Sequence, residues 1–339
     1  MLRIGIAGFG FMGRMHFRQW KAIKGVKVVA ICDANPNIKE DTKRAVGNIK
    51  GADGDIDFTS IEVYHDLEQM LDKAKLDAIS LTLPTYLHAT CSEQALSRGV
   101  NVLCEKPMAL TTVDCDRMIK AAHKSGKVLQ IGHCVRFWPG YDKTKEIVDS
   151  GKYGKVIAGM FQRLGSAPGW AADNWFADEA RSGGVALDLH IHDTDYVQYL
   201  FGMPKAVSSH GGKGPKGQLI HIVTEYEYGD DKVVVAEGGW AMAPTFGFEM
   251  SFNLILEKAS IIFDITRNPV FRVCPREGEV FTPPVPAGDG YSLEIEHFVK
   301  TIRGESVPPI LTLEQSRDSV RIVEAEKKSI NSRERILIK

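Results

Sequence analysis

Over the first 130 or so residues, short apolar runs alternate with stretches in which apolar residues recur at helical spacing. The apolar runs have the length of strands: Arg3–Ala7, Val26–Cys32, Ala78–Leu83, Asn101–Cys104 and Val128–Ile131. The stretches between them predict amphipathic helices: Met12–Ile23, Pro36–Val46, His65–Lys73, His88–Arg98 and Thr111–Ser125. Strand, helix and strand at this spacing predict right-handed βαβ units and a doubly wound parallel sheet covered on both faces.

From about Lys155 the pattern changes to consecutive strand-like runs, mostly without helices between them: Val156–Arg163, Gln218–Tyr228, Lys232–Trp240, Glu249–Leu256, Ser260–Asp264 and Val270–Val273. Such a series predicts a mainly antiparallel sheet of the α+β kind. Further helices are predicted at Gly183–Phe201, Tyr291–Arg303 and Leu313–Ser329, and surface loops at Gly211–Gly217 and Pro283–Gly290. A length of 339 residues fits two domains, which we place at 1–134 and 135–339.

Composition narrows the class of protein. The 42 basic residues nearly balance the 43 acidic ones, which argues against a nucleic-acid partner that needs a basic stripe. No apolar run approaches the roughly 18 residues of a membrane span, and the first residues lack the features of a secretory signal. The six cysteines show no zinc-site spacing, so we expect reduced structural thiols and no metal. We therefore expect a soluble, cytoplasmic protein with no membrane partner.

The segment Gly8-Phe9-Gly10-Phe11-Met12-Gly13 lies between the first strand and the first helix. In that context Gly8 permits a tight turn, Gly10 lets the backbone approach a pyrophosphate, and Gly13 allows close packing of helix and strand. The helix N-terminus presents free N–H groups to phosphates. Asp33 ends the second strand, where a carboxylate accepts hydrogen bonds from ribose hydroxyls and repels a 2′-phosphate, which favours NAD over NADP. The alternative is a glycine turn and an ordinary loop aspartate.

Two later motifs carry candidate chemistry. In Glu105-Lys106-Pro107, at the end of a strand, Lys106 could stabilise negative charge on a substrate oxygen, although alone it reads as a surface lysine. Asp188 and His192 are four residues apart and share one face of a helix. A histidine beside a carboxylate is a sound general base, although an ordinary ion pair would show the same spacing. Asp193 and Asp195 are alternative carboxylate partners.

Taken in order, the glycine motif, Thr82-Leu83-Pro84-Thr85-x-x-His88, Glu105-Lys106-Pro107 and Gly183–Asp193 resemble the glucose–fructose oxidoreductase/inositol dehydrogenase/rhizopine-catabolism (Gfo/Idh/MocA) family. The likeness extends over essentially the whole chain. It implies an N-terminal Rossmann domain followed by an α+β domain on a large open sheet, which often forms homodimers or homotetramers. It also implies NAD(P)-dependent oxidation or reduction of a sugar, polyol or related hydroxy compound in carbohydrate metabolism.

The resemblance also implies roles for single positions. Lys106, Asp188 and His192 match the catalytic trio, with His192 as the base, Asp188 orienting it and Lys106 holding the substrate oxygen. The expected cofactor contacts are Gly8, Gly10, Phe11, Met12, Gly13, Asp33, Thr82, Pro84, His88, Glu105 and Lys106. The expected substrate contacts are Lys106, Arg136, Trp170, Asn174, Trp175, Asp188 and His192. The chain departs from the family pattern at Val185 and His190, where glycine is common.

Two other functions remain open. The same fold can use NAD transiently to cleave glycosides, and a non-catalytic NAD- or sugar-binding protein would carry the same residues. The remaining histidines, His16 among them, are expected to be structural or on the surface.

Overall fold

The structure is a computed structural model that describes residues 1–39, 56–169 and 172–338, without the side chains of 172–174. The chain divides into two compact units. Unit 1 comprises Met1–His133, Pro168–Ser182 and Tyr291–Arg317; unit 2 comprises Cys134–Ala167, Gly183–Gly290 and Asp318–Lys339. The predicted division at residue 134 differs from these units, because unit 1 includes two later segments.

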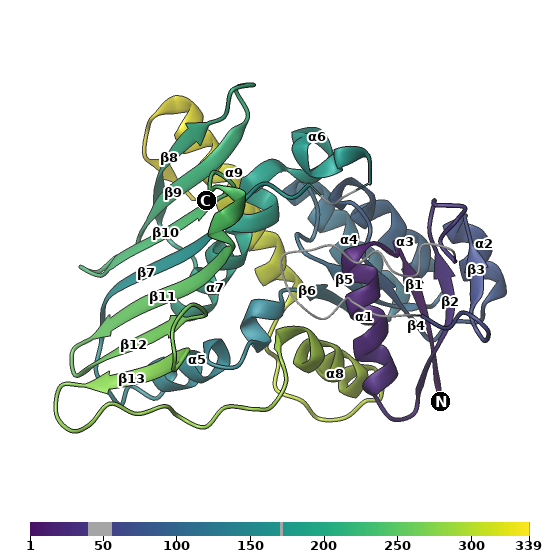
Figure 1. Ribbon diagram of the computed structural model, residues 1–339, viewed down its shortest axis with the longest axis horizontal. Helices are drawn as coiled ribbons and strands as arrows, with labels where there is room; N and C mark the ends of the chain where they lie inside the picture. The colour runs from purple at the N-terminus through teal and green to yellow at the C-terminus, as the bar shows by residue number, and fades with distance from the viewer. Residues whose placement is uncertain (40–55, 170–171, 339) are drawn as a thin grey trace. The chain divides into compact units, whose positions relative to one another are not determined.

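Unit 1 contains a six-stranded sheet (Figure 1). Its strands are β1 (Leu2–Ala7), β2 (Val26–Cys32), β3 (Glu62–Tyr64), β4 (Ala78–Leu81), β5 (Asn101–Glu105) and β6 (Leu129–Gly132). They lie in the order β3-β2-β1-β4-β5-β6, and all neighbours are parallel. This order reverses direction between β1 and β4, where doubly wound sheets bind ligands at the carboxyl ends of their strands. The predicted Rossmann sheet is confirmed; β3 was missed because three residues carry little pattern.

The first four helices of unit 1 follow the predicted alternation: α1 (Phe11–Ala22), α2 (Leu67–Lys73), α3 (His88–Ser97) and α4 (Thr112–Ser125). Helix α8 (Gly290–Ile302) matches the later prediction at Tyr291–Arg303, and the short α6 (Glu179–Ser182) was not predicted. Right-handed connections from β1 to β2 and from β4 to β5 run in opposite directions along the sheet, so α1 and α3 cover opposite faces (Figure 1). The predicted helix at 36–46 lies mostly outside the described residues, and 36–39 form a turn.

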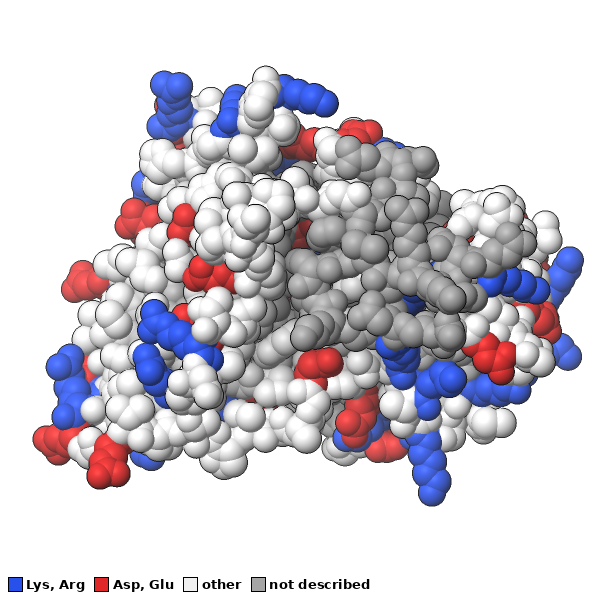
Figure 2. Space-filling model, viewed as in Figure 1, with Lys and Arg blue, Asp and Glu red and all other residues white. Residues whose placement is uncertain are grey.

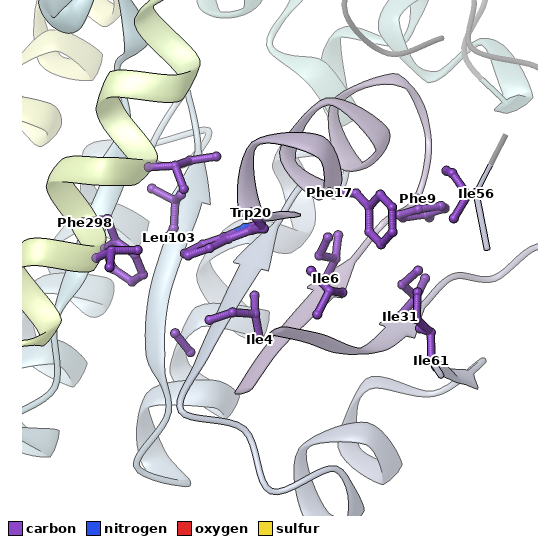
Figure 3. Packing of buried hydrophobic residues seen from close by; sticks show 14 of the residues in the cluster. Ile4, Ile6, Phe9, Phe17, Trp20, Ile31, Ile56, Ile61, Leu103 and Phe298 are labelled. Carbon is purple, nitrogen blue, oxygen red and sulfur yellow. The ribbon is translucent and has the colours of Figure 1, made fainter. Parts of the chain in front are cut away.

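The core of unit 1 joins segments that are distant in sequence. Ile4 and Ile6 of β1 lie beneath Trp20 and Phe17 of α1, and Phe298 of α8 packs against the same cluster (Figure 3). The Trp20 and Phe298 rings meet edge to face, with centroids 6.1 Å apart. Burying each such side chain stabilises the fold by about 1.5–3 kcal/mol. Helix α8 therefore belongs to the core of the Rossmann unit, although it follows that sheet by about 160 residues.

Unit 2 contains an eight-stranded sheet in the order β13-β12-β11-β7-β10-β9-β8-β14. The strands are β7 (Val156–Gly165), β8 (Ala206–Lys213), β9 (Leu219–Glu227), β10 (Val233–Gly239), β11 (Phe248–Leu256), β12 (Ala259–Asp264), β13 (Phe271–Pro275) and β14 (Ile336–Leu337). Only β7 and β10 pair in parallel, so the mainly antiparallel sheet is confirmed. The predicted loop at Gly211–Gly217 is wrong at its start, because β8 extends to Lys213. A Cβ on Gly211 would lie 2.5 Å from Leu219 Cδ1, so glycine suits this strand position.

Helices α5 (Tyr141–Asp149), α7 (Ile191–Phe201) and α9 (Leu313–Ser332), the last from Asp318 onward, complete unit 2. Helix α7 lies along one face of the sheet (Figure 1). Between them is an aromatic core, in which the ring of Tyr141 contacts those of Tyr196, Phe252 and Phe263 at centroid distances of 4.6–4.9 Å. The opposite side of the sheet is not covered by these helices and carries partly exposed apolar side chains, which we call the open face: Met160, Val233, Val235 and Ile255.

The surface agrees with the near-neutral composition. Lys and Arg side chains lie among Asp and Glu side chains over the described part of the face shown in Figure 2. None of the helices in the described ranges is both long and apolar enough to cross a membrane. All six cysteines are free thiols, as predicted.

Candidate active site

The glycine turn of unit 1 is held together by contacts that leave no room for a side chain. A Cβ on Gly8, which has φ +83°, would lie 2.6 Å from the Thr82 carbonyl oxygen, and one on Gly13 would lie 2.1 Å from the Gly8 carbonyl oxygen. Thr82 donates its hydroxyl to that Gly8 oxygen at 2.5 Å. Gly10 differs, because it is exposed and a Cβ there would meet no atom within 4 Å. The N-terminus of α1 is thus open to a phosphate group.

Asp33 lies at the carboxyl end of β2, beside this turn. Its Oδ2 accepts a hydrogen bond from the Phe9 N–H at 2.5 Å, and its Oδ1 accepts one from the Asn35 N–H at 2.8 Å. The carboxylate is therefore oriented by backbone amides while remaining half-buried. Arg14 is buried, with its guanidinium over the Phe9 ring. The open Gly10 backbone and the oriented Asp33 carboxylate fit the pyrophosphate and ribose of a dinucleotide.

Three of the other expected cofactor contacts are half-buried, and one is fully buried. Phe11 and Met12, in the first turn of α1, and Pro84, before a 3-10 turn, are half-buried. His88 is fully buried, and its Nδ1 lies 2.8 Å from the Pro107 carbonyl oxygen and its Nε2 2.9 Å from the Leu83 carbonyl oxygen. Burial lowers the pKa of His88. This ring connects the loop after β4 with the turn that follows Lys106.

Glu105 and Lys106 form the end of β5. Glu105 is buried, with Oε1 2.9 Å from His16 Nε2, and its Oε2 accepts the Lys106 backbone N–H at 3.2 Å. Burial alone would raise the pKa of Glu105, but its hydrogen bond to His16, together with the charge of Lys106, leaves it lowered. Glu105 is therefore an ionised carboxylate beside the half-buried Lys106.

In unit 2, Asp188 and His192 lie on an irregular helix start. The predicted helix Gly183–Phe201 is helical from Gly184 onward, but residues Ala186–His190 form a π-helical turn, and α7 follows at Ile191. From Val185 to Gln198 every residue is buried except Asp188 and His192, which are half-buried. The fold thus exposes this acid and this histidine from an otherwise buried segment. π-Helical turns occur frequently at functional sites.

The two competing carboxylates are engaged in buried ion pairs. Asp193 accepts two hydrogen bonds from Arg163 at 2.8 and 3.1 Å. Asp195 accepts two from Arg136 at 2.8 Å each. The Arg136 guanidinium also donates to Gln198 Oε1 at 3.1 Å. Asp188 therefore remains the candidate partner of His192, and the expectation for Arg136 changes, because its guanidinium binds α7.

The two residues that depart from the family pattern lie in the core of unit 2. Val185 and His190 are both fully buried. His190 Nε2 lies 3.3 Å from the Tyr226 hydroxyl and 3.6 Å from Glu326 Oε1. The same Tyr226 and Glu326 also bind Thr194. No sequence motif marks this polar network, since its members come from three distant elements.

The aromatic candidates are only partly described. Trp170 and the side chain of Asn174 lie outside the described residues. Trp175 is half-buried and stacks on Phe176, with ring centroids 4.0 Å apart. Lys106 and the cofactor candidates belong to unit 1, whereas Asp188 and His192 belong to unit 2. Among the described residues, no group of His, Cys, Asp and Glu side chains could hold a metal ion.

Two family models match these two regions. Residues 2–133 match the oxidoreductase family with an NAD-binding Rossmann fold, and residues 141–262 match the GFO/IDH/MocA C-terminal domain. The chain belongs to the Gfo/Idh/MocA oxidoreductase family. The resemblance drawn from the motifs is thereby confirmed, together with an NAD-binding Rossmann domain.

Within the Gfo/Idh/MocA family, the chain is similar to proteins with different names. It is 29% identical over 245 residues to the 2,7-anhydro-N-acetylneuraminate hydratase of Mediterraneibacter gnavus, covering 70% of this chain and 61% of the relative. It is 24% identical to the myo-inositol 2-dehydrogenase of Thermotoga maritima, covering 98% of this chain and 97% of that one. The crystal structure of myo-inositol 2-dehydrogenase from Lactobacillus plantarum superposes with a TM-score of 0.81 at 26% identity, covering 100% of this chain and 99% of that one.

Proposed function

We propose that this chain is an NAD-dependent oxidoreductase that transfers a hydride between nicotinamide and a sugar, a polyol or a related hydroxy compound. The support comes from the Rossmann glycine turn with its oriented Asp33 and from inositol dehydrogenases that match nearly the full length. The observation that carries the proposal is the exposure of Asp188 and His192 alone in an otherwise buried segment. An ion pair with a purely structural role would not need to be more exposed than the residues around it.

The turn at Gly8–Gly13 and Asp33 would hold NAD, which would supply the hydride acceptor for the carbon that carries the hydroxyl group. His192 takes the hydroxyl proton, and Asp188 orients the ring and stabilises the imidazolium. Lys106 binds the same oxygen and offsets its developing negative charge. Asp33 binds the adenosine ribose and excludes a 2′-phosphate, so NAD is preferred to NADP.

We further propose that the protein is a cytoplasmic homodimer or homotetramer that assembles through the open face. Met160, Val233 and Ile255 on that face are 41–45% exposed. Contiguous exposed apolar side chains are typical of protein–protein contacts. Measuring the molecular mass of the Met160→Asp variant in solution tests this assembly, since a charge in the contact between open faces should give monomers.

A panel of polyols, sugars and glycosides, each with NAD and with NADP, tests the function. Absorbance of NADH and release of product are followed together. The dehydrogenase proposal requires net NADH formation with a polyol or sugar. Product release without net NADH indicates the transient-NAD reaction. NAD binding without any turnover indicates a sensor.

On the substrate found, Lys106→Met and His192→Ala should each lower kcat by about 10²- to 10⁴-fold, the range typical of general acid–base residues. The NAD affinity of His192→Ala should stay unchanged, measured by quenching of protein fluorescence. Near-wild-type turnover in either variant would contradict the assignment. Asp33→Ala should reduce the preference for NAD, and a wild-type preference for NADP would refute the role of Asp33.

A further inference from the structure

A chain of buried side chains runs from helix α1 to Lys106. His16, Ser80 and Trp20 are all completely buried, and Glu105 nearly so. Trp20 donates its indole N–H to Ser80 Oγ at 2.8 Å. His16 Nδ1 lies 3.0 Å from the same Oγ, and its Nε2 lies 2.9 Å from Glu105 Oε1. The other Glu105 oxygen accepts the Lys106 N–H.

Counting donors and acceptors fixes the tautomer of His16. The indole N–H can only donate, so Ser80 Oγ accepts from Trp20 and must place its own proton elsewhere. Among the described residues, His16 Nδ1 is the acceptor within reach of the Ser80 hydroxyl. Nδ1 therefore carries a lone pair, and the ring proton is on Nε2, which points at Glu105. An imidazolium would leave the buried Ser80 proton without an acceptor, and an Nδ1–H tautomer would aim a lone pair at the carboxylate.

The surroundings of Glu105 explain why this one carboxylate is charged. Glu294, on α8, is also fully buried, and neither of its carboxyl oxygens has a hydrogen-bond partner in the described part of the chain. Burial, and then the charge of Glu105, raises the pKa of Glu294 well above its usual value. Glu294 is therefore neutral beside its ionised neighbour. The other charged or titratable groups that act on Glu105 are His16, Lys106 and His88.

The neighbouring strand β6 leaves space for the Glu105 carboxylate. Gly132, on β6, lies opposite Glu105 in the parallel register. A Cβ there would lie 3.2 Å from Glu105 Cα and 3.3 Å from its Oε1. Any other residue would press on the side chain that His16 orients. The strand, the helix and the glycine together determine one position for the Glu105 carboxylate.

We propose that His16 is a positioning residue: as the neutral Nε2–H tautomer it aligns the Glu105 carboxylate and thereby places a fixed negative charge next to Lys106. The role of Lys106 rests on the proposed function, whereas the tautomer does not. His16 acts through Glu105.

Nitrogen NMR of protein labelled with ¹⁵N-histidine tests the tautomer without a substrate. Long-range proton–nitrogen spectra are recorded with NAD present, and His16→Gln assigns its signals among the 10 histidines. A neutral ring with the proton on Nε2 at neutral pH is expected. A cationic ring or an Nδ1–H tautomer would overturn the proposal.

Kinetics test the positioning role on the substrate found above. A glutamine at 16 offers an N–H donor and a carbonyl acceptor, whereas leucine offers neither. His16→Leu should lower kcat by about 10- to 100-fold, by analogy with the loss seen when a residue that orients a metal ligand is removed. His16→Gln should recover most of that loss. His297→Gln, on α8, is the matched control and should retain wild-type kcat.

Equal kcat in His16→Leu and wild type would overturn the positioning role. Equal losses in the leucine and glutamine variants would do the same, because they would indicate a packing effect alone. If the panel yields no substrate, the proposed function fails, and the NMR result still decides the tautomer.

Discussion

Asp193 and Asp195 of unit 2 and Glu105 and Glu294 of unit 1 are buried acids with different partners. In unit 2, Asp193 and Asp195 each face an arginine in a two-bond ion pair, and both pairs are buried. Among the described residues of unit 1, Glu105 has no arginine partner and is held by His16 and a backbone amide, and the Glu294 carboxyl group has no hydrogen-bond partner.

The arginine pairs hold a helix in position, whereas the contacts of Glu105 determine the charge of a side chain. Paired charges cancel over a wide range of pH, so they suit the anchoring of α7 beneath His192. A carboxylate that depends on a histidine, a lysine and a neutral acid responds to the protonation of its neighbours. The two arginine pairs of unit 2 therefore hold α7 in place, whereas the charge of Glu105 depends on its neighbours.

Breaking an ion pair in unit 2 should have the largest effect on stability. Arg163→Met leaves Asp193 charged, buried and unpaired, which should lower the free energy of unfolding by about 3–5 kcal/mol in urea denaturation. The double variant Arg163→Met/Asp193→Asn should recover part of that loss, because no charge is then left uncompensated. A double variant no more stable than Arg163→Met would contradict this view of the pair.

Replacing Glu294 by glutamine should show how the buried carboxyl group of unit 1 makes stability depend on pH. Because the folded-state pKa of Glu294 is raised above 4.5, the unfolded chain releases this proton first as pH rises. Wild-type stability therefore falls by about 1.4 kcal/mol per pH unit above that value, until the folded carboxyl ionises. Glu294→Gln should remove this loss, so its stability advantage should grow between about pH 5 and pH 7 and vanish near pH 4.

Thermal unfolding across that pH range measures the Glu294 effect. Glu296→Gln is the matched control, since Glu296 lies two residues away, is exposed and pairs with Lys300 at 2.8 Å. The control should follow wild type at every pH. Parallel curves for wild type and Glu294→Gln would show that Glu294 is ionised in the folded protein.

An exposed ion pair should have the smallest effect. Arg335 binds both oxygens of Glu227 on the surface of unit 2, with nearly half of each side chain exposed. Water screens such pairs, so Arg335→Met should leave the urea midpoint unchanged within the scatter of replicate measurements. A loss comparable to that of Arg163→Met would mean that burial is not what separates the two pairs.

Much of this could be predicted from the order of residues along the chain. Hydrophobic periodicity located the parallel sheet and most of its helices, because both depend on local spacing. The glycine turn was also predictable, since Gly8 and Gly13 meet steric demands that recur wherever a strand turns into a helix. The pairing of Arg136 with Asp195 was not, because 59 residues separate the partners and either could have faced solvent.

The sequence by itself determined the family, the dinucleotide-binding turn and the identity of the candidate acid, base and lysine. Only the tertiary structure decided which carboxylates are engaged, that α8 completes the core of unit 1, and that His16 meets Glu105 across 89 positions of the chain. The physical reason is range: turns and helices follow from neighbouring residues, whereas burial and hydrogen-bond partners depend on which distant segments pack together.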